Sequence, residues 1–156
     1  KVMGICGGYQ MLGRKVSDPE GIEGPPGEEK GLGLLDVETV LRPAKRLAQI
    51  TGRDLLTNTN ITGFEMHIGV TAGYDTQRPM LKLNTGAHGA TSVNGMVSGA
   101  YVHGLFASDD FRLSFLRSLS PGARSGIQYE ARIDAELDRL ATHLETNINI
   151  DAMLAG

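Results

Sequence analysis

The chain has 156 residues, 40% of them hydrophobic and 21% charged, so it is long and apolar enough to fold as one globular domain. Its 15 Lys and Arg residues and 18 Asp and Glu residues give a net charge of −3, which disfavours nucleic acid as a partner. No apolar stretch reaches the roughly 18 residues that span a membrane. The only cysteine cannot form an internal disulfide, and no basic and apolar leader precedes it, so we expect a cytoplasmic protein.

The first expected element is a short buried strand over Val2–Ile5, followed by glycines and by a helix that begins near Tyr9. The opening residues "KVMGI" have no element ahead of them to pair with, although so glycine-dense a motif usually lies at the centre of a sheet. We therefore expect residues 1–156 to form one domain that is incomplete at its N-terminus, as a fragment of a longer protein.

The middle of the chain predicts a loop and three strands. Residues 17–31 hold four glycines and three prolines among charged residues, which is typical of a surface loop. The apolar stretch 32–41 predicts a strand with a hairpin partner within 46–56. In 62–71, "TGFEMHIGVT", apolar side chains alternate with Glu65, His67 and a glycine. This pattern predicts a half-buried strand that carries two ionisable side chains on one face.

The next segment predicts a strand and then a helix. A turn at Asn94-Gly95 should precede a strand over 96–102 that ends at His103. Ser108 is expected to cap a helix that continues through Leu119, because acidic residues follow it in the first turn.

A second long helix is expected near the C-terminus, with one face packed on the core. Its apolar residues recur at helical spacing: Ile133, Leu137, Leu140, Ala141 and Leu144. Asp151 is expected to cap a last turn. Strands interleaved with helices indicate an α/β domain.

The stretch "VMGICGGYQMLG" places Cys6 between the first strand and the first helix, among glycines. This is the pattern of a nucleophile elbow, a strained turn in which side chains at the glycines are expected to clash. The N-terminus of the helix would favour the thiolate, and the N–H of Gly7 would help to stabilise an oxyanion. The alternative is a buried structural cysteine in a tight strand-to-helix turn.

A thiol nucleophile needs a base that accepts and returns protons. His103 is the first candidate, because at the end of its strand its ring can emerge at the same sheet edge as Cys6. His67 is the second, since it shares a strand face with Glu65. A histidine at a strand end is also commonly satisfied by structural hydrogen bonds, so this role stays open.

The other two histidines, His88 in "TGAHGA" and His143 on the late helix, are expected to be solvated. The sequence has no Cys-x-x-Cys or His-x-x-x-His spacing, so we expect no metal site. A Gly-x-x-x-x-Gly-Lys loop is also missing, so ATP is not expected to bind here. We expect no cofactor in this domain.

Four motifs in order, "GICGGYQMLG", "GLGLLDVETVL", "GFEMHIGVT" and "YVHGLF", resemble the C-terminal glutamine amidotransferase domain of the cobyric acid synthase family. The resemblance runs from Lys1 to about Leu154 and includes the "DPEGIEGPPG" loop. It implies a class I amidotransferase with a flavodoxin-like α/β fold, in which a mixed, mostly parallel sheet is flanked by helices. It also implies Cys6 as nucleophile, His103 as general base and Gln10 as a contact to the substrate glutamine.

The chain departs from most class I enzymes, which place an orienting glutamate two residues after the catalytic histidine; here Leu105 occupies that position. The cobyric acid branch shares this absence, so the orienting group has no assigned residue. Our hypothesis for a polar group near the site is Glu65, with His67 beside it; the alternative is an exposed pair on an edge strand. The upstream glycine loop that supplies a second oxyanion donor is also absent, so we expect little activity from these 156 residues alone.

The resemblance implies a function within a larger enzyme. Ammonia released from glutamine would pass to a synthetase domain of the same protein, which uses ATP and magnesium. The family amidates carboxylates of a corrinoid, adenosylcobyrinic acid a,c-diamide, in cobalamin biosynthesis. The alternatives are a related amidotransferase for another acceptor, such as cobyrinic acid or lipid II, and a non-catalytic module of the same fold.

Overall fold

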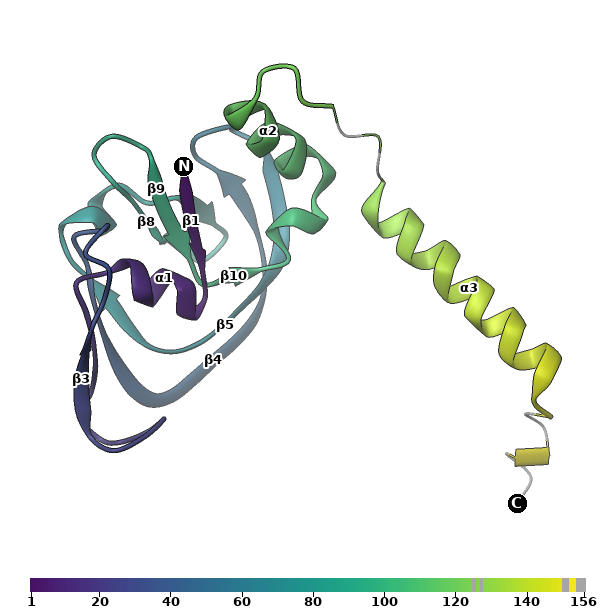
Figure 1. The fold of residues 1–156 in the computed structure, drawn as a ribbon, viewed down its shortest axis with the longest axis horizontal. Coiled ribbons are helices and arrows are strands. Elements are labelled where there is room, and N and C mark those ends of the chain that lie inside the picture. Colours follow the sequence, from purple (N-terminus) through teal and green to yellow (C-terminus); the bar gives the residue numbers. More distant parts are fainter. Residues whose placement is uncertain (125, 127, 150–151, 154–156) are drawn as a thin grey trace.

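Two β-sheets form the body of the molecule, and a long C-terminal helix extends away from it (Figure 1). The computed structural model describes residues 1–124, 126, 128–149 and 152–153. The smaller sheet has the order β1-β9-β8, formed by Val2–Ile5, Val97–Ala100 and Ala90–Thr91. The larger sheet has the order β10-β5-β4-β2-β3, formed by Val102–His103, Asn60–Ala72, Glu38–Asp54, Lys15–Asp18 and Gly27–Lys30. On the edge opposite β5, the end of β4 also pairs with β6 (Leu81–Leu83), which in turn pairs with β7 (Gly86–His88).

The expected mixed α/β fold is confirmed, since multi-stranded sheets and helices both form. The balance of strand directions differs from the expectation, however. The pairs β1 with β9 and β2 with β4 are parallel, and the other described pairs are antiparallel. A parallel pair needs a crossover connection, whereas β4 and β5 follow each other through a short turn and so pair antiparallel.

The predicted strand over 32–41 and its hairpin partner within 46–56 are wrong, because residues 38–54 form the single strand β4. Its partner is β5, which runs beside it for most of its length. The register shifts between Val40 and Lys45, a segment that contains Pro43. A proline has no N–H for the ladder, so it favours a bulge in a continuous strand as readily as a turn between two strands.

The predicted surface loop 17–31 is shorter than expected. Its two ends belong to β2 and β3, which pair as an antiparallel hairpin. The carboxylate of Asp18 accepts hydrogen bonds from the N–H groups of Ile22 and Glu23 and so orders the turn between them. These bonds hold the pKa of Asp18 below its usual value.

The predicted strand over 96–102 is interrupted. Val97–Ala100 forms β9 in the smaller sheet, and Val102–His103 forms β10 in the larger sheet. Tyr101 lies between them, so the chain passes from one sheet to the other at this residue. The expected turn at Asn94-Gly95 is confirmed, with Gly95 at φ 67°.

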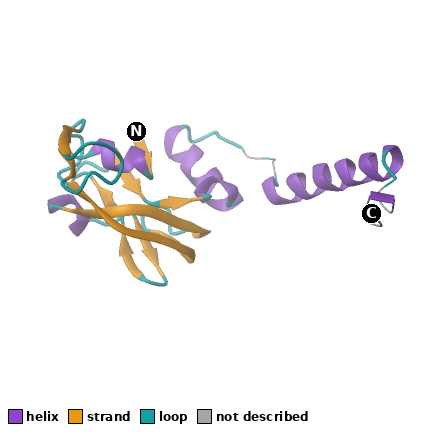
Figure 2. Ribbon diagram, turned by 90° about the horizontal axis from the view of Figure 1, so that it is seen from below, coloured by secondary structure: helices purple, strands orange, loops and turns teal. Residues whose placement is uncertain are grey.

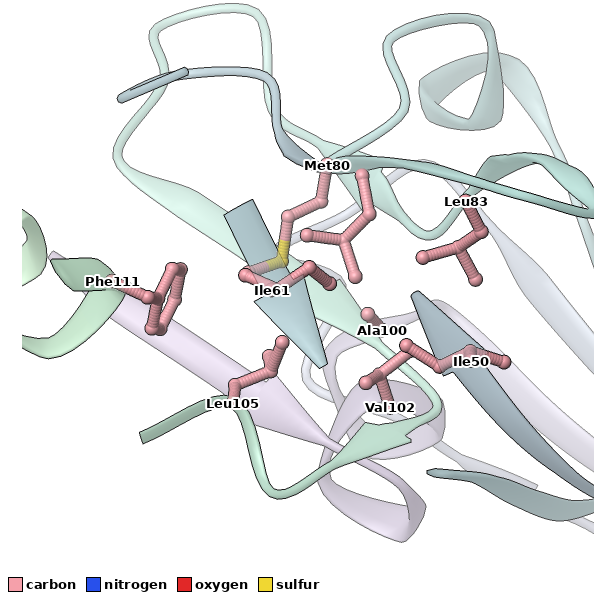
Figure 3. Packing of buried hydrophobic residues seen from close by; sticks show 9 residues of the cluster. Ile50, Ile61, Met80, Leu83, Ala100, Val102, Leu105 and Phe111 are labelled. Carbon is pink, nitrogen blue, oxygen red and sulfur yellow. The ribbon is translucent and has the colours of Figure 1, made fainter. Parts of the chain in front are cut away.

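The larger apolar core fills the space between the two sheets and α2 (Asp109–Leu119). Figure 3 shows its side chains pointing toward one another from several strands and from this helix. Its buried members are Ile50, Ile61, Met80, Leu81, Leu83, Ala100, Val102, Leu105 and Phe111. A second buried cluster lies beneath α1 (Gly7–Leu12) and consists of Tyr9, Leu12, Leu35, Val37, Ala90 and Tyr101.

The helix predicted after Ser108 is confirmed as α2. Ser108 is its N-cap, and the hydroxyl oxygen accepts a hydrogen bond from the N–H of Phe111. The helix ends at Leu119, as the sequence predicts. Local signals suffice here because capping depends only on neighbouring residues.

The second long helix forms as α3 (Tyr129–Asn147), but the prediction that it packs on the core is wrong. None of its residues is buried, and Figures 1 and 2 show it projecting from the body. Its large apolar side chains are 39% to 57% exposed: Ile133, Leu137, Leu140 and Leu144. Periodicity predicts an apolar face and does not identify what covers it. The expected cap at Asp151 lies outside the described residues.

No helix among the described residues is long and apolar enough to cross a membrane.

Candidate functional site

Cys6 lies between β1 and α1 in a backbone conformation that residues with a side chain rarely adopt. Its φ is 55° and its ψ is −121°. Such conformations cost roughly 1–3 kcal/mol and persist only where the surroundings fix them, so they concentrate at functional sites. The predicted strained turn is therefore present, and the strained residue is the cysteine itself.

The predicted reason for the neighbouring glycines needs correction. A Cβ atom added at Gly7 or Gly8 would meet nothing within 4 Å, so neither glycine relieves a clash. The steric requirement falls on Gly4, where a Cβ would lie 2.6 Å from the carbonyl oxygen of Gly8. Gly7 is exposed and Gly8 is half-buried, and as the first residues of α1 their N–H groups have no acceptor within that helix. α1 has only six residues, so its summed dipole is weaker than a longer helix would supply.

The strain at Cys6 predicts an effect on stability that is independent of its thiol. Glycine adopts positive φ freely, whereas alanine keeps the steric penalty of a Cβ. We expect Cys6→Gly to unfold about 2–4 °C higher than Cys6→Ala, which corresponds to about 1 kcal/mol of relieved strain in a domain of this size. Thermal unfolding followed by circular dichroism measures the difference. Equal melting temperatures would show that the backbone at Cys6 is not strained.

Cys6 is joined to both sheets. Its N–H donates to the carbonyl oxygen of Ala100 at the end of β9, with an N···O distance of 3.0 Å. Its Sγ lies 3.5 Å from the carbonyl oxygen of Met66 in β5, to which the thiol donates. One helical turn later, the amide nitrogen of Gln10 donates to the carbonyl oxygen of Ile68 in the same strand, at 3.3 Å. The predicted residues Cys6 and Gln10 therefore line the same stretch of β5.

His103 is the last residue of β10, and it lies opposite Phe64 in the neighbouring strand β5. The two rings are stacked, with centroids 5.0 Å apart and an interplanar angle of 6°. Gly63 permits this close approach, because a Cβ there would lie 2.1 Å from the carbonyl oxygen of His103. The Nε2 atom of His103 is buried and has no hydrogen-bond partner among the described residues. A buried nitrogen without a partner costs about 1–3 kcal/mol, so structures retain few of them.

The structure brings Cys6 and His103 into one neighbourhood without a direct hydrogen bond between them in the described part of the chain. The N–H of Cys6 is hydrogen-bonded to Ala100, and His103 follows Ala100 by three residues, with a bend at Tyr101. Three extended residues span at most about 11 Å. Both residues also contact β5 at positions two residues apart, Phe64 and Met66.

Glu65 and His67 belong to this same stretch of β5 and contact each other as predicted. Nε2 of His67 is 2.9 Å from Oε1 of Glu65, and Nδ1 of His67 is 3.1 Å from the carbonyl oxygen of Gly69. Nε of Arg46 in β4 donates to Oε2 of Glu65 at 2.5 Å. Burial alone would raise the pKa of Glu65, but the hydrogen bonds from Arg46 and His67 outweigh burial and hold it below its usual value.

The alternative of an exposed pair on an edge strand is wrong, because Glu65 is only 4% exposed and β5 has neighbours on both sides. In a half-buried strand the apolar side chains usually face the core and the polar side chains face solvent, but at Phe64 and Glu65 in β5 this is reversed. Phe64, on the apolar face, is 37% exposed, while the face that carries Glu65 turns inward. An alternating sequence predicts two faces and does not establish that the inner one is apolar.

His88 belongs to the same polar cluster, so the expectation that it is solvated is wrong. Its side chain is 14% exposed, and its Nδ1 lies 3.8 Å from Oε1 of Glu65. Its Nε2 accepts a hydrogen bond from the N–H of Tyr101 at 3.1 Å. His143, in contrast, is exposed on α3, as the sequence predicts. The missed signal at His88 is long-range, since its partners are 13 and 23 residues away in the chain.

A cavity of about 250 Å³ adjoins this polar cluster. Its lining includes Tyr9, Glu65, His67, Thr71, His88 and Tyr101. A second cavity, of about 230 Å³, lies between β1 and α2, is mostly apolar and contains none of the predicted site residues. In the described part of the chain no group of three or more His, Cys, Asp or Glu residues is arranged to hold a metal ion.

Comparison with known proteins places this geometry in a family. Residues 1–111 match the CobB/CobQ-like glutamine amidotransferase domain. The chain is 52% identical to the cobyric acid synthase of Cereibacter sphaeroides, over 99% of this chain and 32% of that protein. It is 53% identical to the cobyric acid synthase of Methylobacterium nodulans and 50% identical to that of Bradyrhizobium diazoefficiens, with the same two coverages. The chain thus spans about a third of the length of these relatives. It belongs to the family of CobB/CobQ-like glutamine amidotransferase domains.

Proposed function

We propose that this chain is the glutaminase part of a cobyric acid synthase, with Cys6 as the nucleophile and His103 as the general base. The observation that carries the proposal is the strained Cys6, whose thiol lies against the same strand as His103, a histidine whose buried Nε2 has no partner among the described residues. Strain and an orphaned polar atom both cost stability, and both are expected where catalysis requires them.

In this mechanism the thiol of Cys6 gives its proton to His103 and the sulfur attacks the side-chain amide carbon of glutamine. The N–H of Gly7, the first residue of α1, supports the oxyanion of the tetrahedral intermediate, and Gln10 contacts the substrate. His103 then gives the proton to the departing nitrogen, and the C–N bond breaks to leave ammonia and a thioester. Water gives a proton to His103 and attacks the thioester carbon, and the C–S bond then breaks, which releases glutamate while His103 returns the proton to the sulfur of Cys6.

The relatives' names support a role in a larger enzyme, because the chain covers only about a third of each. We propose that residues 1–156 are part of an amidotransferase domain whose ammonia passes to a synthetase domain of the same cytoplasmic protein. That domain would use ATP and magnesium to amidate the carboxylates of a corrinoid, adenosylcobyrinic acid a,c-diamide, in cobalamin biosynthesis.

The test is an amide-transfer assay on the complete protein with glutamine labelled with ¹⁵N in its side chain. With adenosylcobyrinic acid a,c-diamide, ATP and magnesium, mass spectrometry should show labelled nitrogen in the corrinoid product. Hydrolysis of glutamine without corrinoid labelling, but with labelling of cobyrinic acid or lipid II, would assign another acceptor. A protein that neither hydrolyses glutamine nor reacts with diazo-oxo-norleucine at Cys6 would be a non-catalytic module.

Glu65 is proposed to support the site by holding β5 in place between the contacts to Cys6 and His103. Glu65→Gln removes the negative charge that pairs with Arg46 and His67, while it keeps the size of the side chain. We expect a loss of about 1–3 kcal/mol of stability, the scale of a broken charged hydrogen bond beside a half-exposed partner, together with a lower kcat for glutamine hydrolysis. Unchanged glutaminase activity in Glu65→Gln would remove this role.

A further inference from the structure

The peptide group between Ala100 and Tyr101 joins the two sheets at the point where the chain leaves β9 and enters β10. Its carbonyl oxygen accepts the N–H of Cys6 at 3.0 Å, and its N–H donates to Nε2 of His88 at 3.1 Å. A trans peptide group is planar, with its C=O and N–H on opposite edges. Cys6 and His88 therefore hold the two edges of one rigid plane.

His88 supplies an acceptor that neither sheet provides to Tyr101. Because Nε2 accepts a hydrogen bond, the proton of the neutral ring is on Nδ1, the atom that faces Glu65 at 3.8 Å. The backbone directly after His88 is constrained at Gly89, whose φ is 74° and whose missing Cβ leaves room for the carbonyl oxygen of Gly99. The strand β7 and the turn at Gly89 thus fix the backbone of His88. The tautomer makes its Nε2 an acceptor.

We propose that His88 is a positioning residue for Cys6, because it fixes the peptide plane to which the strained backbone of Cys6 is bonded. The expected effect of His88 on glutaminase activity rests on the proposed function, whereas its effect on the backbone of Cys6 does not. A strained conformation persists where its surroundings determine it fully, and the N–H of Cys6 has its acceptor on this plane. If His88 no longer accepted from Tyr101, the plane would be free to rotate and Cys6 to relax.

The surroundings of His88 keep its acceptor nitrogen free of a proton. Burial lowers the pKa of His88, and the nearby charges of His67 and Arg46 lower it further, while the Glu65 carboxylate opposes them. The neutral ring that the hydrogen bond requires is therefore the form present near neutral pH. Tyr101 adds a ring contact to His88 and a stacked contact to His67, with ring centroids 6.1 Å and 3.9 Å apart.

The experiment compares three variants of the complete protein. His88→Gln places an amide oxygen near the position of Nε2, His88→Asn carries the same group on a shorter side chain, and His88→Leu removes the acceptor at similar volume. We expect His88→Leu and His88→Asn to lower kcat for glutamine hydrolysis by about 10- to 100-fold with KM nearly unchanged, since small displacements of a reacting atom have effects of this size. His88→Gln should remain within a few-fold of the wild type.

A second measurement does not depend on glutaminase activity. The rate at which iodoacetamide alkylates Cys6, followed by mass spectrometry of its peptide, should change in His88→Leu and return in His88→Gln. If the wild type fails to hydrolyse glutamine, the proposed function falls, and the alkylation rates alone decide the role of His88. If His88→Gln behaves like His88→Leu in both measurements, or if all three variants match the wild type, the positioning role is wrong.

Discussion

Replacing Cys6 with serine should abolish glutamine-dependent amidation in the complete protein. A serine hydroxyl is a far weaker nucleophile than a thiolate at neutral pH, and loss of a nucleophile in comparable hydrolases lowers kcat by roughly 10⁴-fold or more. Glutamate release measured with labelled glutamine gives the rate. The conformation of the turn should be retained, because serine keeps the Cβ and hence the same backbone restrictions.

Ammonium salts provide the control for Cys6→Ser. If Cys6 serves only to release ammonia, amidation of the acceptor should continue in the variant when ammonia is supplied directly. Loss of both glutamine-dependent and ammonia-dependent amidation would mean that the substitution disturbs the enzyme elsewhere. Retention of glutamine-dependent activity would exclude Cys6 as the nucleophile.

Replacing His103 with phenylalanine should have opposite effects on stability and on activity. A phenylalanine ring can keep the stacked contact with Phe64 and removes the buried Nε2, which has no partner in the described part of the chain, so we expect stability to rise by about 1 kcal/mol. The same change removes the general base, and kcat for glutamine hydrolysis should fall roughly 10²- to 10⁴-fold. Chemical denaturation and steady-state kinetics measure the two effects.

The matched control is His143→Phe, because His143 is exposed on α3 and far from Cys6 in the chain. It should leave glutamine hydrolysis unchanged. A His103→Phe variant that loses stability and activity together would indicate that the ring serves packing only. A variant with full activity would exclude His103 as the base.

The sequence predicted best what depends on neighbouring residues. The α2 cap at Ser108, the strand before Cys6 and the pairing of Glu65 with His67 each follow from spacings of two or three residues. The motif around Cys6 also predicted a strained turn with a steric requirement for glycine, which is confirmed at Gly4 and wrong at Gly7 and Gly8.

What the sequence did not predict depends on contacts between distant segments. The position of His88 beside Glu65 follows from the pairing of β7 with β6 and of β6 with β4, which no local pattern encodes. The exposure of α3 is similar, since its apolar spacing is compatible with any apolar neighbour. The Nε2 of His103 has no hydrogen-bond partner among the described residues. This too is a property of the folded site, because it depends on which groups the rest of the chain places around the ring.

Three consecutive residues of β5 face three different parts of the proposed site: Phe64 meets His103, Glu65 meets the polar cluster, and Met66 meets Cys6. Side chains alternate along a strand with a period of two, so a shift by one residue would turn the side chains at the Phe64 and Glu65 positions to the opposite faces and would move the carbonyl oxygen of Met66 away from Cys6. A deletion or insertion of a single residue within β5 would therefore damage the site more than most substitutions in it. Over evolutionary time the length of this strand should be held more strictly than its composition, and single-residue gaps should collect in the turn between β4 and β5.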